Sequence, residues 1–252
     1  MNHRFDWRVH RDVISGLKQG CLIGLAIAVM TIQPTGSARL ATPTLAPPAP
    51  AAAAHRAVDW RGSAATDDAR TIAEWVADSR DNGSLPFAIL DKRDARVYVF
   101  DSEARLIAAS PVLLGAAPGD DSVAGIGQRP ISQVRPEERT TPAGRFISAP
   151  GRNASGEDVV WVDYDNAVSM HRVRPVDPKE RRLERLASPD PAQRRISYGC
   201  INVPVAFFDS VVQPVLASGR AVVYVLPETR PLQQTFAAYA VSETRISAAN
   251  SR

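Results

Sequence analysis

Cysteine, histidine and aromatic residues are scarce in this chain of 252 residues, which contains two cysteines, four histidines and 6% aromatic residues. A closed zinc site needs three or four Cys or His ligands. Residues 85–227, the predicted folded domain, contain one cysteine and one histidine. We therefore expect no metal site and no cofactor, and a disulfide framework is excluded for the same reason.

An excess of charge of one sign is also absent. The formal net charge is +3, and the first 38 residues account for +2 of it because they hold four Lys or Arg residues against two Asp residues. The remaining +1 gives no reason to expect a nucleic-acid partner. The composition leaves the oligomeric state open.

The apolar run near the N-terminus is too short to span a bilayer. It extends from Cys21 to Ile32, twelve residues, where a spanning helix needs about 20. It follows several basic residues and precedes small residues ending at Ala38, as in a secretory signal. We predict that residues 1–38 are a signal peptide or N-terminal anchor and that the protein is exported to the periplasm or cell envelope. An uncleaved segment would tether it to the membrane.

Composition divides the remaining chain into four parts. Residues 39–65 are rich in Pro and Ala and predict a tether, because such a stretch cannot bury a core. Residues 66–84 predict an amphipathic helix that packs on the domain, with Asp67 or Asp68 as cap and Asn82 before Gly83 as stop. Residues 85–227 form the predicted folded domain, and residues 228–252 are a polar C-terminal tail.

Residues 85–227 contain short β-branched or aromatic segments separated by turn residues, which is typical of a mainly antiparallel sheet. Residues 204–219 instead predict a helix that begins at Pro204, is shortened or kinked at Pro214 and ends at Gly219. The predicted fold class is mainly β (α+β). The predicted strands occupy residues 87–91, 95–101, 105–110, 144–149, 158–164, 167–172 and 221–227.

Cys200 has no partner for a disulfide once residues 1–38 are removed, because Cys21 lies in the predicted signal. Gly199 permits close approach of the backbone, and the amides of the following helix favour a thiolate. We interpret Cys200 as an activated nucleophile rather than a buried core thiol. His171 is the only histidine outside the predicted signal and tether. It is therefore the only imidazole available as a base.

Other reaction types lack their motifs. A Ser/His/Asp hydrolase needs a turn such as GxSxG, which is absent. Residues 115–130 are rich in glycine but lack the Lys and the strand-to-helix context of a phosphate-binding loop. Papain-like proteases have Cys before His, the reverse of the order here. Sortases share the order of His before Cys and need an arginine near the thiol from a later strand, which Arg220 could supply. The Gly-Cys turn, however, fits a sortase poorly.

Two motifs resemble the L,D-transpeptidase (YkuD-type) catalytic domains of bacterial peptidoglycan metabolism. His171 ends a strand, and Ser197, Tyr198, Gly199, Cys200, Ile201 and Asn202 follow in the order of the family signature. Thr140–Phe146 is similar to its Thr-Pro-x-Gly-x-Phe segment, and residues 219–226 are similar to its final strand. The resemblance extends over residues 85–227. It implies a β-sandwich or barrel of short strands, with a helix after the cysteine.

The resemblance also implies a reaction. Cys200 would attack the carbonyl between the third and fourth residues of a peptidoglycan stem peptide, release D-alanine and form a thioester. His171 would be the general base, with its ring oriented by the carbonyl of Arg172. Backbone amides around Tyr198, Gly199 and Cys200 would form the oxyanion hole, and Ser197 belongs to the same turn.

The chain departs from the family pattern in two respects. Tyr198 stands where a histidine is usual, and a phenol with a pKa of ~10 is no base near neutral pH. The interval from His171 to Ser197 has 25 residues, longer than usual in the family. We call residues 172–195 the insertion and expect a helical flap over the cleft, either a solvated surface or a lid that attracts carboxylates. Arg195 is the expected partner of a substrate carboxylate, and Asn202 and Arg172 are further substrate-binding candidates.

Two alternatives remain open at this point. With water as acceptor, the same site would be an L,D-carboxypeptidase or another hydrolase. A catalytically silent cell-wall-binding domain would retain the fold without an activated thiol.

Overall fold

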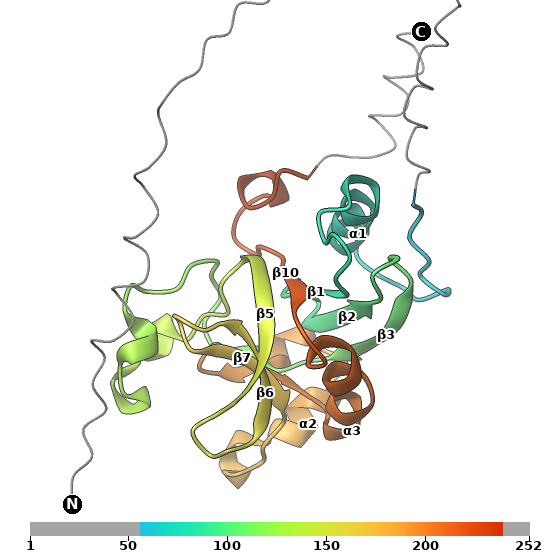
Figure 1. Ribbon diagram of the computed structural model, residues 1–252. Coiled ribbons are helices and arrows are strands. Elements are labelled where there is room, and N and C mark those ends of the chain that lie inside the picture. The colour runs from blue at the N-terminus through green and yellow to red at the C-terminus, as the bar shows by residue number, and fades with distance from the viewer. Residues whose placement is uncertain (1–55, 239–252) are drawn as a thin grey trace, which may run out of the picture. The chain divides into compact units, whose positions relative to one another are not determined.

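The computed structural model describes residues 56–238 (Figure 1). The predicted signal, most of the predicted tether and the end of the predicted tail lie outside these residues. No helix within residues 56–238 is long and apolar enough to cross a membrane.

An eight-stranded sheet forms the domain, in the order β3-β2-β1-β10-β5-β6-β7-β9, and β4 pairs with β8 in a second, two-stranded sheet. Most neighbours are antiparallel, but the β1–β10, β7–β9 and β4–β8 pairs are parallel. The predicted mainly β fold class is confirmed. The strands are β1 (Phe87–Asp91), β2 (Arg96–Phe100), β3 (Leu106–Pro111), β4 (Leu114–Gly115), β5 (Gly144–Arg152), β6 (Asp158–Asp163), β7 (Val168–Arg172), β8 (Arg195–Ser197), β9 (Ile201–Val203) and β10 (Ala221–Val225).

Helical segments cover both faces of the sheet, and short 3₁₀ turns lie within the segments that connect the strands. α1 lies against one face, beside β1 and β2, and α3 lies by the opposite face (Figure 1). The helices are α1 (Asp67–Ser79), α2 (Arg182–Ala187) and α3 (Val205–Phe207), the π-helix η6 (Phe208–Leu216), and the 3₁₀ turns η1 (Ile126–Gln128), η2 (Ile131–Gln133), η3 (Pro136–Glu138), η4 (Pro178–Glu180), η5 (Pro191–Arg194) and η7 (Leu232–Gln234).

The central strands are buried on both faces, so they contribute to two hydrophobic cores. In β1, Ala88 and Leu90 face a core that includes η6, whereas Phe87 and Ile89 face a core that includes α1. All five residues of β1 and of β10 are buried. Period-two alternation places successive side chains on opposite faces, and here both faces are apolar because each has a helical cover.

The helix ends differ from those predicted. Thr66, not Asp67 or Asp68, is the N-cap of α1, and its hydroxyl accepts a hydrogen bond from the amide of Ala69 at 3.2 Å. Arg80, in the left-handed conformation with φ 57°, ends the helix before the predicted stop at Asn82. After Pro204, three α-helical residues pass into the π-helix η6, which contains Pro214.

The folded unit extends beyond residues 85–227 at both ends. Trp60 belongs to the predicted tether, yet its ring packs edge-on against Tyr98 and Phe100 at centroid distances of 5.6 and 5.3 Å. Phe236 in the predicted tail is buried against Tyr224. Composition is averaged over a stretch, whereas one aromatic ring suffices to attach a segment to a core.

Candidate active site

Two adjacent parallel strands bring together the residues of the predicted site. In the pairing of β7 with β9, His171 lies opposite Asn202 and Met170 lies opposite Ile201. Cys200 immediately precedes β9, at the end of a turn that begins after β8. Strand pairing therefore places the imidazole next to the thiol although 28 residues separate them in sequence.

The turn that carries Cys200 is held by its own side chains and by the Thr140–Thr141 segment. The Ser197 hydroxyl donates to the Cys200 carbonyl at 2.6 Å and accepts from the Gly199 amide at 3.1 Å. The Thr141 hydroxyl donates to the Gly199 carbonyl at 2.8 Å. Gly199 has φ 127°, and a Cβ there would lie 2.8 Å from the Thr140 carbonyl oxygen. Only glycine fits this position without displacing backbone.

The two central side chains shift each other's proton affinity. Burial acts to lower the pKa of His171, but its hydrogen bond and charge interaction with Cys200 outweigh burial and raise that pKa. Burial acts to raise the pKa of Cys200, and the interaction with His171 outweighs it and lowers that pKa. The Cys200 sulfur also lies 3.5 Å from the Ala167 carbonyl oxygen and 3.7 Å from the Ser169 hydroxyl. The pair thus favours thiolate and imidazolium.

The lowered pKa of Cys200 predicts an unusual pH profile for alkylation. Iodoacetamide reacts with the thiolate, whose share of an ordinary thiol with a pKa of ~8.5 falls about tenfold per pH unit below that value. For Cys200 the rate should stay near its plateau below pH 8.5 and decline only at more acidic pH. The rate, measured by mass spectrometry from pH 5 to 10 beside free cysteine, would contradict the prediction if both profiles coincide.

The His171 ring is oriented by a backbone carbonyl. Its Nδ1 lies 2.8 Å from the Arg172 carbonyl oxygen. Because a carbonyl can only accept, Nδ1 carries a proton in this contact, and Nε2 is left to exchange protons. The structure gives the Arg172 carbonyl the orienting position that the family resemblance implies.

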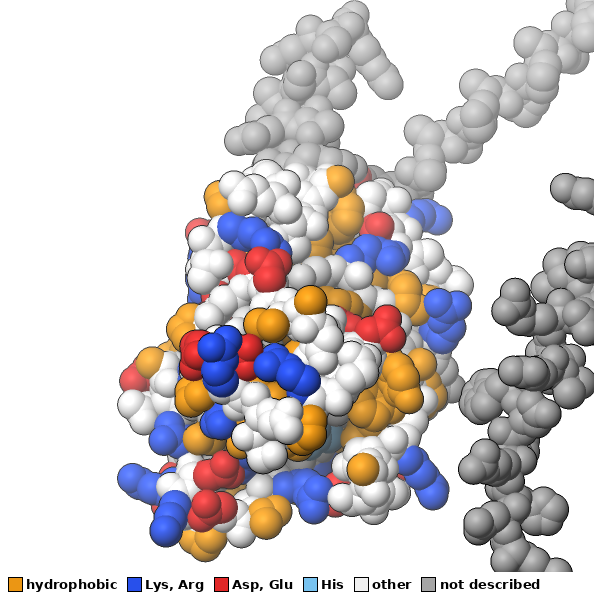
Figure 2. All heavy atoms as spheres, turned by 90° about the vertical axis from the view of Figure 1, so that its left-hand side faces the viewer, with side chains coloured by type: hydrophobic (Ala, Val, Ile, Leu, Met, Phe, Trp, Pro, Cys, Tyr) orange, Lys and Arg blue, Asp and Glu red, His pale blue; other side chains and the backbone are white. Residues whose placement is uncertain are grey.

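An open cleft of about 570 Å³ exposes this pair to solvent. Tyr198 is 36% exposed at the cleft, and the Arg139 guanidinium lies 4.0 Å from its ring centroid. Ile131, from the loop between β4 and β5, and Val176, from the insertion, are strongly exposed. Figure 2 shows the face on which this loop lies, where hydrophobic side chains are interspersed with basic and acidic ones. The cleft therefore combines the Cys200 thiol with exposed apolar side chains and with charged residues of the insertion.

Two predicted substrate-binding arginines have partners outside the cleft, contrary to expectation. The guanidinium of Arg195 pairs with Glu228 and donates to the Lys92 carbonyl at 2.8 Å, and its side chain is 15% exposed. The Arg172 side chain pairs with Asp209 and stacks on Phe208 at 4.2 Å from the ring centroid. Each partner lies far away in the sequence, so no local pattern indicated it.

The insertion contributes a residue that the sequence analysis missed. It forms η4, α2 and η5, and Asp177 caps η4 by accepting from the Lys179 amide at 2.9 Å. Arg182 lines the same cleft as His171 and Cys200 and donates to the Asn202 side-chain oxygen at 2.6 Å. Its position among eight basic residues of residues 172–195 gave no sequence signal that distinguished it.

Within residues 56–238, no group of three or more His, Cys, Asp or Glu side chains is arranged to hold a metal ion.

No protein-family model matches the sequence, and no curated protein matches it. Several solved structures are similar to the chain. The catalytic domain of the E. faecium L,D-transpeptidase is 14% identical, with a TM-score of 0.33, over 57% of this chain and 98% of that domain. The chain is similar in fold to L,D-transpeptidase catalytic domains. This is the family that its motifs resemble.

Two further similar structures are longer proteins. The L,D-transpeptidase from Mycobacterium smegmatis is 14% identical, with a TM-score of 0.34, over 56% of this chain and 58% of that one. The helical cell shape determining protein Pgp2 from Campylobacter jejuni is 16% identical, with a TM-score of 0.37, over 58% of this chain and 49% of that one. The chain thus spans less than two thirds of either protein, and at these identities the likeness concerns the fold alone.

Proposed function

We propose that the protein is a cysteine acyltransferase that acts on peptidoglycan stem peptides, an L,D-transpeptidase. The observation that carries the proposal is the pairing of Cys200 and His171 in an open cleft, with the thiol pKa lowered and the imidazole pKa raised. A thiolate beside a protonated imidazole is poised for attack on a carbonyl. The peptidoglycan substrate comes from the family resemblance of the motifs.

In the proposed reaction, the Cys200 sulfur forms a bond to the stem-peptide carbonyl carbon. The carbon–nitrogen bond then breaks, and the His171 imidazolium gives its proton to the leaving amino group of D-alanine. In the second half, the neutral imidazole takes a proton from the acceptor amine, which attacks the thioester and releases the thiolate. The Nδ1 contact with the Arg172 carbonyl directs Nε2 to this proton exchange.

Preset backbone amides would stabilise the oxyanion. The Gly199 amide already donates to Ser197, so Tyr198 and Cys200 supply the remaining donors of the predicted set. The Ser197 contacts hold the turn in the shape that presents these donors. Tyr198 then serves through its main chain, and a phenol in place of the usual histidine does not block the reaction.

Incubation with a tetrapeptide muropeptide tests the proposal. The intact mass should increase by one stem acyl group on Cys200, with release of D-alanine, and the Cys200→Ala variant should show neither. Adding an acceptor amine should convert the adduct to cross-linked product, whereas an L,D-carboxypeptidase would give hydrolysed peptide whether or not the amine is present. A correctly folded protein that forms no adduct would refute the proposal.

A carbapenem provides a second probe of the same thiol. Among the similar solved structures are the Ldtfm–avibactam carbamoyl enzyme and LdtMt1 in complex with imipenem. We expect imipenem to add to Cys200, whereas a silent wall-binding domain would show only an ordinary, slow thiol. Action on peptidoglycan also requires export, and we propose the periplasm or cell envelope as its location, reached through residues 1–38.

A further inference from the structure

We propose that Arg182, in the insertion, is a positioning residue that fixes the orientation of the Asn202 amide and thereby holds His171 ready as a proton acceptor. The role in turnover rests on the proposed function, whereas the effect on the imidazole does not require a substrate. No motif of the family resemblance includes this arginine.

The contacts of Asn202 set the direction of its amide. The residue is fully buried. Arg182 Nη1 lies 2.6 Å from Asn202 Oδ1, and because a guanidinium can only donate, the amide oxygen faces it. The amide nitrogen consequently faces the other side, 3.3 Å from His171 Nε2 and 3.4 Å from the Cys200 carbonyl oxygen. Arg182, by the shorter contact, and the Cys200 carbonyl thus both hold the amide with its nitrogen toward the imidazole.

This orientation has a chemical consequence for His171. Its Nδ1 donates to the Arg172 carbonyl, so Nε2 of the neutral ring has a lone pair that accepts from the Asn202 amide. In the imidazolium, Nε2 also bears a hydrogen and would confront the amide hydrogens. The amide held by Arg182 therefore opposes the effect of the Cys200 thiolate and favours neutral imidazole, the form that must deprotonate the acceptor amine once Cys200 is acylated. An amide free to turn would present its oxygen and stabilise the imidazolium instead.

Arg182 is itself held in place. Its side chain is 13% exposed and pairs with Glu180 of η4, so the segment before α2 fixes the guanidinium from the other side. The positive charge of Arg182 acts in the same direction as the amide, since it lowers the pKa of His171. The other charged residues lining this cleft are Arg174, Asp177 and Glu180, and Cys200 faces the ring directly.

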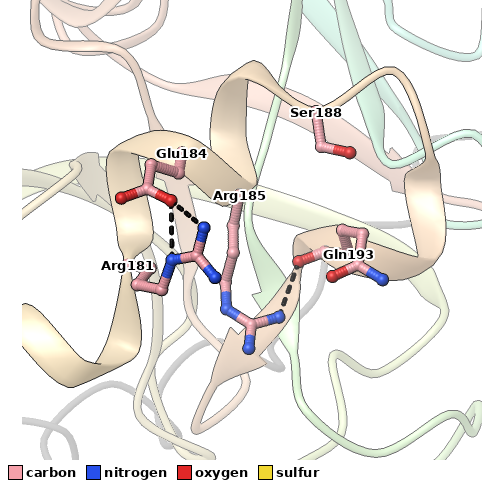
Figure 3. A pocket seen from close by; sticks show the side chains of 5 residues that line it. All are labelled: Arg181, Glu184, Arg185, Ser188 and Gln193. Atoms are coloured by element: carbon pink, nitrogen blue, oxygen red, sulfur yellow. Dashed lines mark hydrogen bonds and ion pairs between the residues drawn. The ribbon is translucent and has the colours of Figure 1, made fainter.

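The neighbouring Arg181 supplies a matched control. It pairs with Glu184, and both line a separate hollow of the insertion together with Arg185, Ser188 and Gln193 (Figure 3). Arg181 is not among the residues that line the cleft. Arg181→Met and Arg182→Met remove the same charge from adjacent positions, and each breaks an ion pair with a glutamate, but only Arg182 is largely buried, contacts Asn202 and lies near His171.

The experiment is an NMR titration of His171 in the full-length protein, together with the pH profile of kcat and KM. Arg182→Met should raise the pKa of the imidazole by ~1 unit. The acidic limb of the pH profile of kcat should move to higher pH by the same amount, while KM stays unchanged. Arg182→Lys, which keeps the charge but lacks the planar fork, should give a smaller shift. Arg181→Met should leave both profiles unchanged.

A double-mutant cycle separates the amide from the charge. In an Asn202→Ala background, Arg182→Met should cause a clearly smaller shift of the His171 pKa than in the unmodified protein, because the amide is gone and only the charge remains. Equal shifts in both backgrounds would overturn the proposal, as would an Arg181→Met shift equal to that of Arg182→Met. If Arg182→Met does not fold, Arg182→Lys in the same two backgrounds provides the test, with a smaller expected shift that should again diminish when Asn202 is alanine.

The outcome separates this inference from the proposed function. A shifted His171 pKa without any adduct on Cys200 would retain the positioning role and refute the transpeptidase. If the unmodified protein forms the adduct but Arg182→Met leaves the His171 pKa unshifted, the transpeptidase proposal is supported and the positioning role is refuted.

Discussion

Replacing His171 with alanine should slow acylation of Cys200 by about a thousandfold at neutral pH, within the range for losing a general acid–base group. The substitution removes both the hydrogen bond and the charge interaction that lower the pKa of the thiol. Burial is then opposed only by the hydrogen bonds with Ser169, so the pKa of the thiol rises above its value in the unmodified protein. The time course of adduct formation with a stem tetrapeptide, followed by intact mass, measures the effect.

Strongly alkaline pH provides the control for this variant. At a pH above the raised thiol pKa, the thiolate forms without help, and iodoacetamide should alkylate the His171→Ala protein at a rate close to that of the unmodified protein. Recovery there shows that the fold is intact and that the imidazole is needed to generate the nucleophile. An acylation rate at neutral pH that is unchanged in His171→Ala would end the assignment of His171.

Asp120→Ala should destabilise the fold by about 3–5 kcal/mol, because it leaves a buried cation without its nearest carboxylate. The Lys92 ammonium is fully buried and lies 2.8 Å from Asp120. The same carboxylate accepts from the backbone amides of Glu228 and Thr229, each at 2.8 Å. Denaturant unfolding monitored by tryptophan fluorescence measures the change in free energy of unfolding.

The adjacent Asp121 is the matched control. Its side chain is 77% exposed and pairs with Arg230, so Asp121→Ala should change the free energy of unfolding by less than about 0.5 kcal/mol. Equal effects of the two substitutions would contradict a structural role for the buried cluster of Lys92, Asp120, Arg195 and Glu228.

This cluster also predicts acid sensitivity. Burial acts to raise the pKa of Asp120, but hydrogen bonds from Lys92, Thr229 and backbone amides outweigh it and hold the pKa well below its usual range. A depressed folded-state pKa contributes stability above the unfolded value of ~3.9, and that stability is lost as the pH falls from there toward the folded value. Stability measured at decreasing pH should therefore fall less steeply in Asp120→Ala than in the unmodified protein.

The cluster engages the side chain of Arg195, which the sequence suggested as a substrate ligand. Arg195 is the first residue of β8, only five residues before the thiol. Its guanidinium instead reaches Glu228, just beyond β10. By this ion pair, the strand that leads into the turn carrying Cys200 is connected to the segment that follows β10. Proximity in sequence to Cys200 predicted a role in binding, and the direction of the side chain decided otherwise.

The sequence alone was sufficient for the features that depend on local chemistry. Alternating β-branched segments located most strands, because a half-buried or buried strand requires these side chains. The scarcity of Cys and His identified Cys200 and His171, since no other thiol or imidazole lay in the folded region. Gly199 was recognisable for a similar reason, because the turn before the nucleophile requires a residue without Cβ.

Tertiary structure decided everything that depends on which distant residues meet. The β1–β10 and β7–β9 pairs are parallel, which strand-sized patterns do not reveal, and the β7–β9 pair is what places Asn202 against His171. The attachment of Trp60 and Phe236, the burial of Arg195 and the contact of Arg182 with Asn202 likewise join segments separated along the chain. Composition and spacing indicate which chemistry a residue is capable of. Its partner is fixed only in the folded protein, because each buried charge or amide there needs an ion pair or a hydrogen bond.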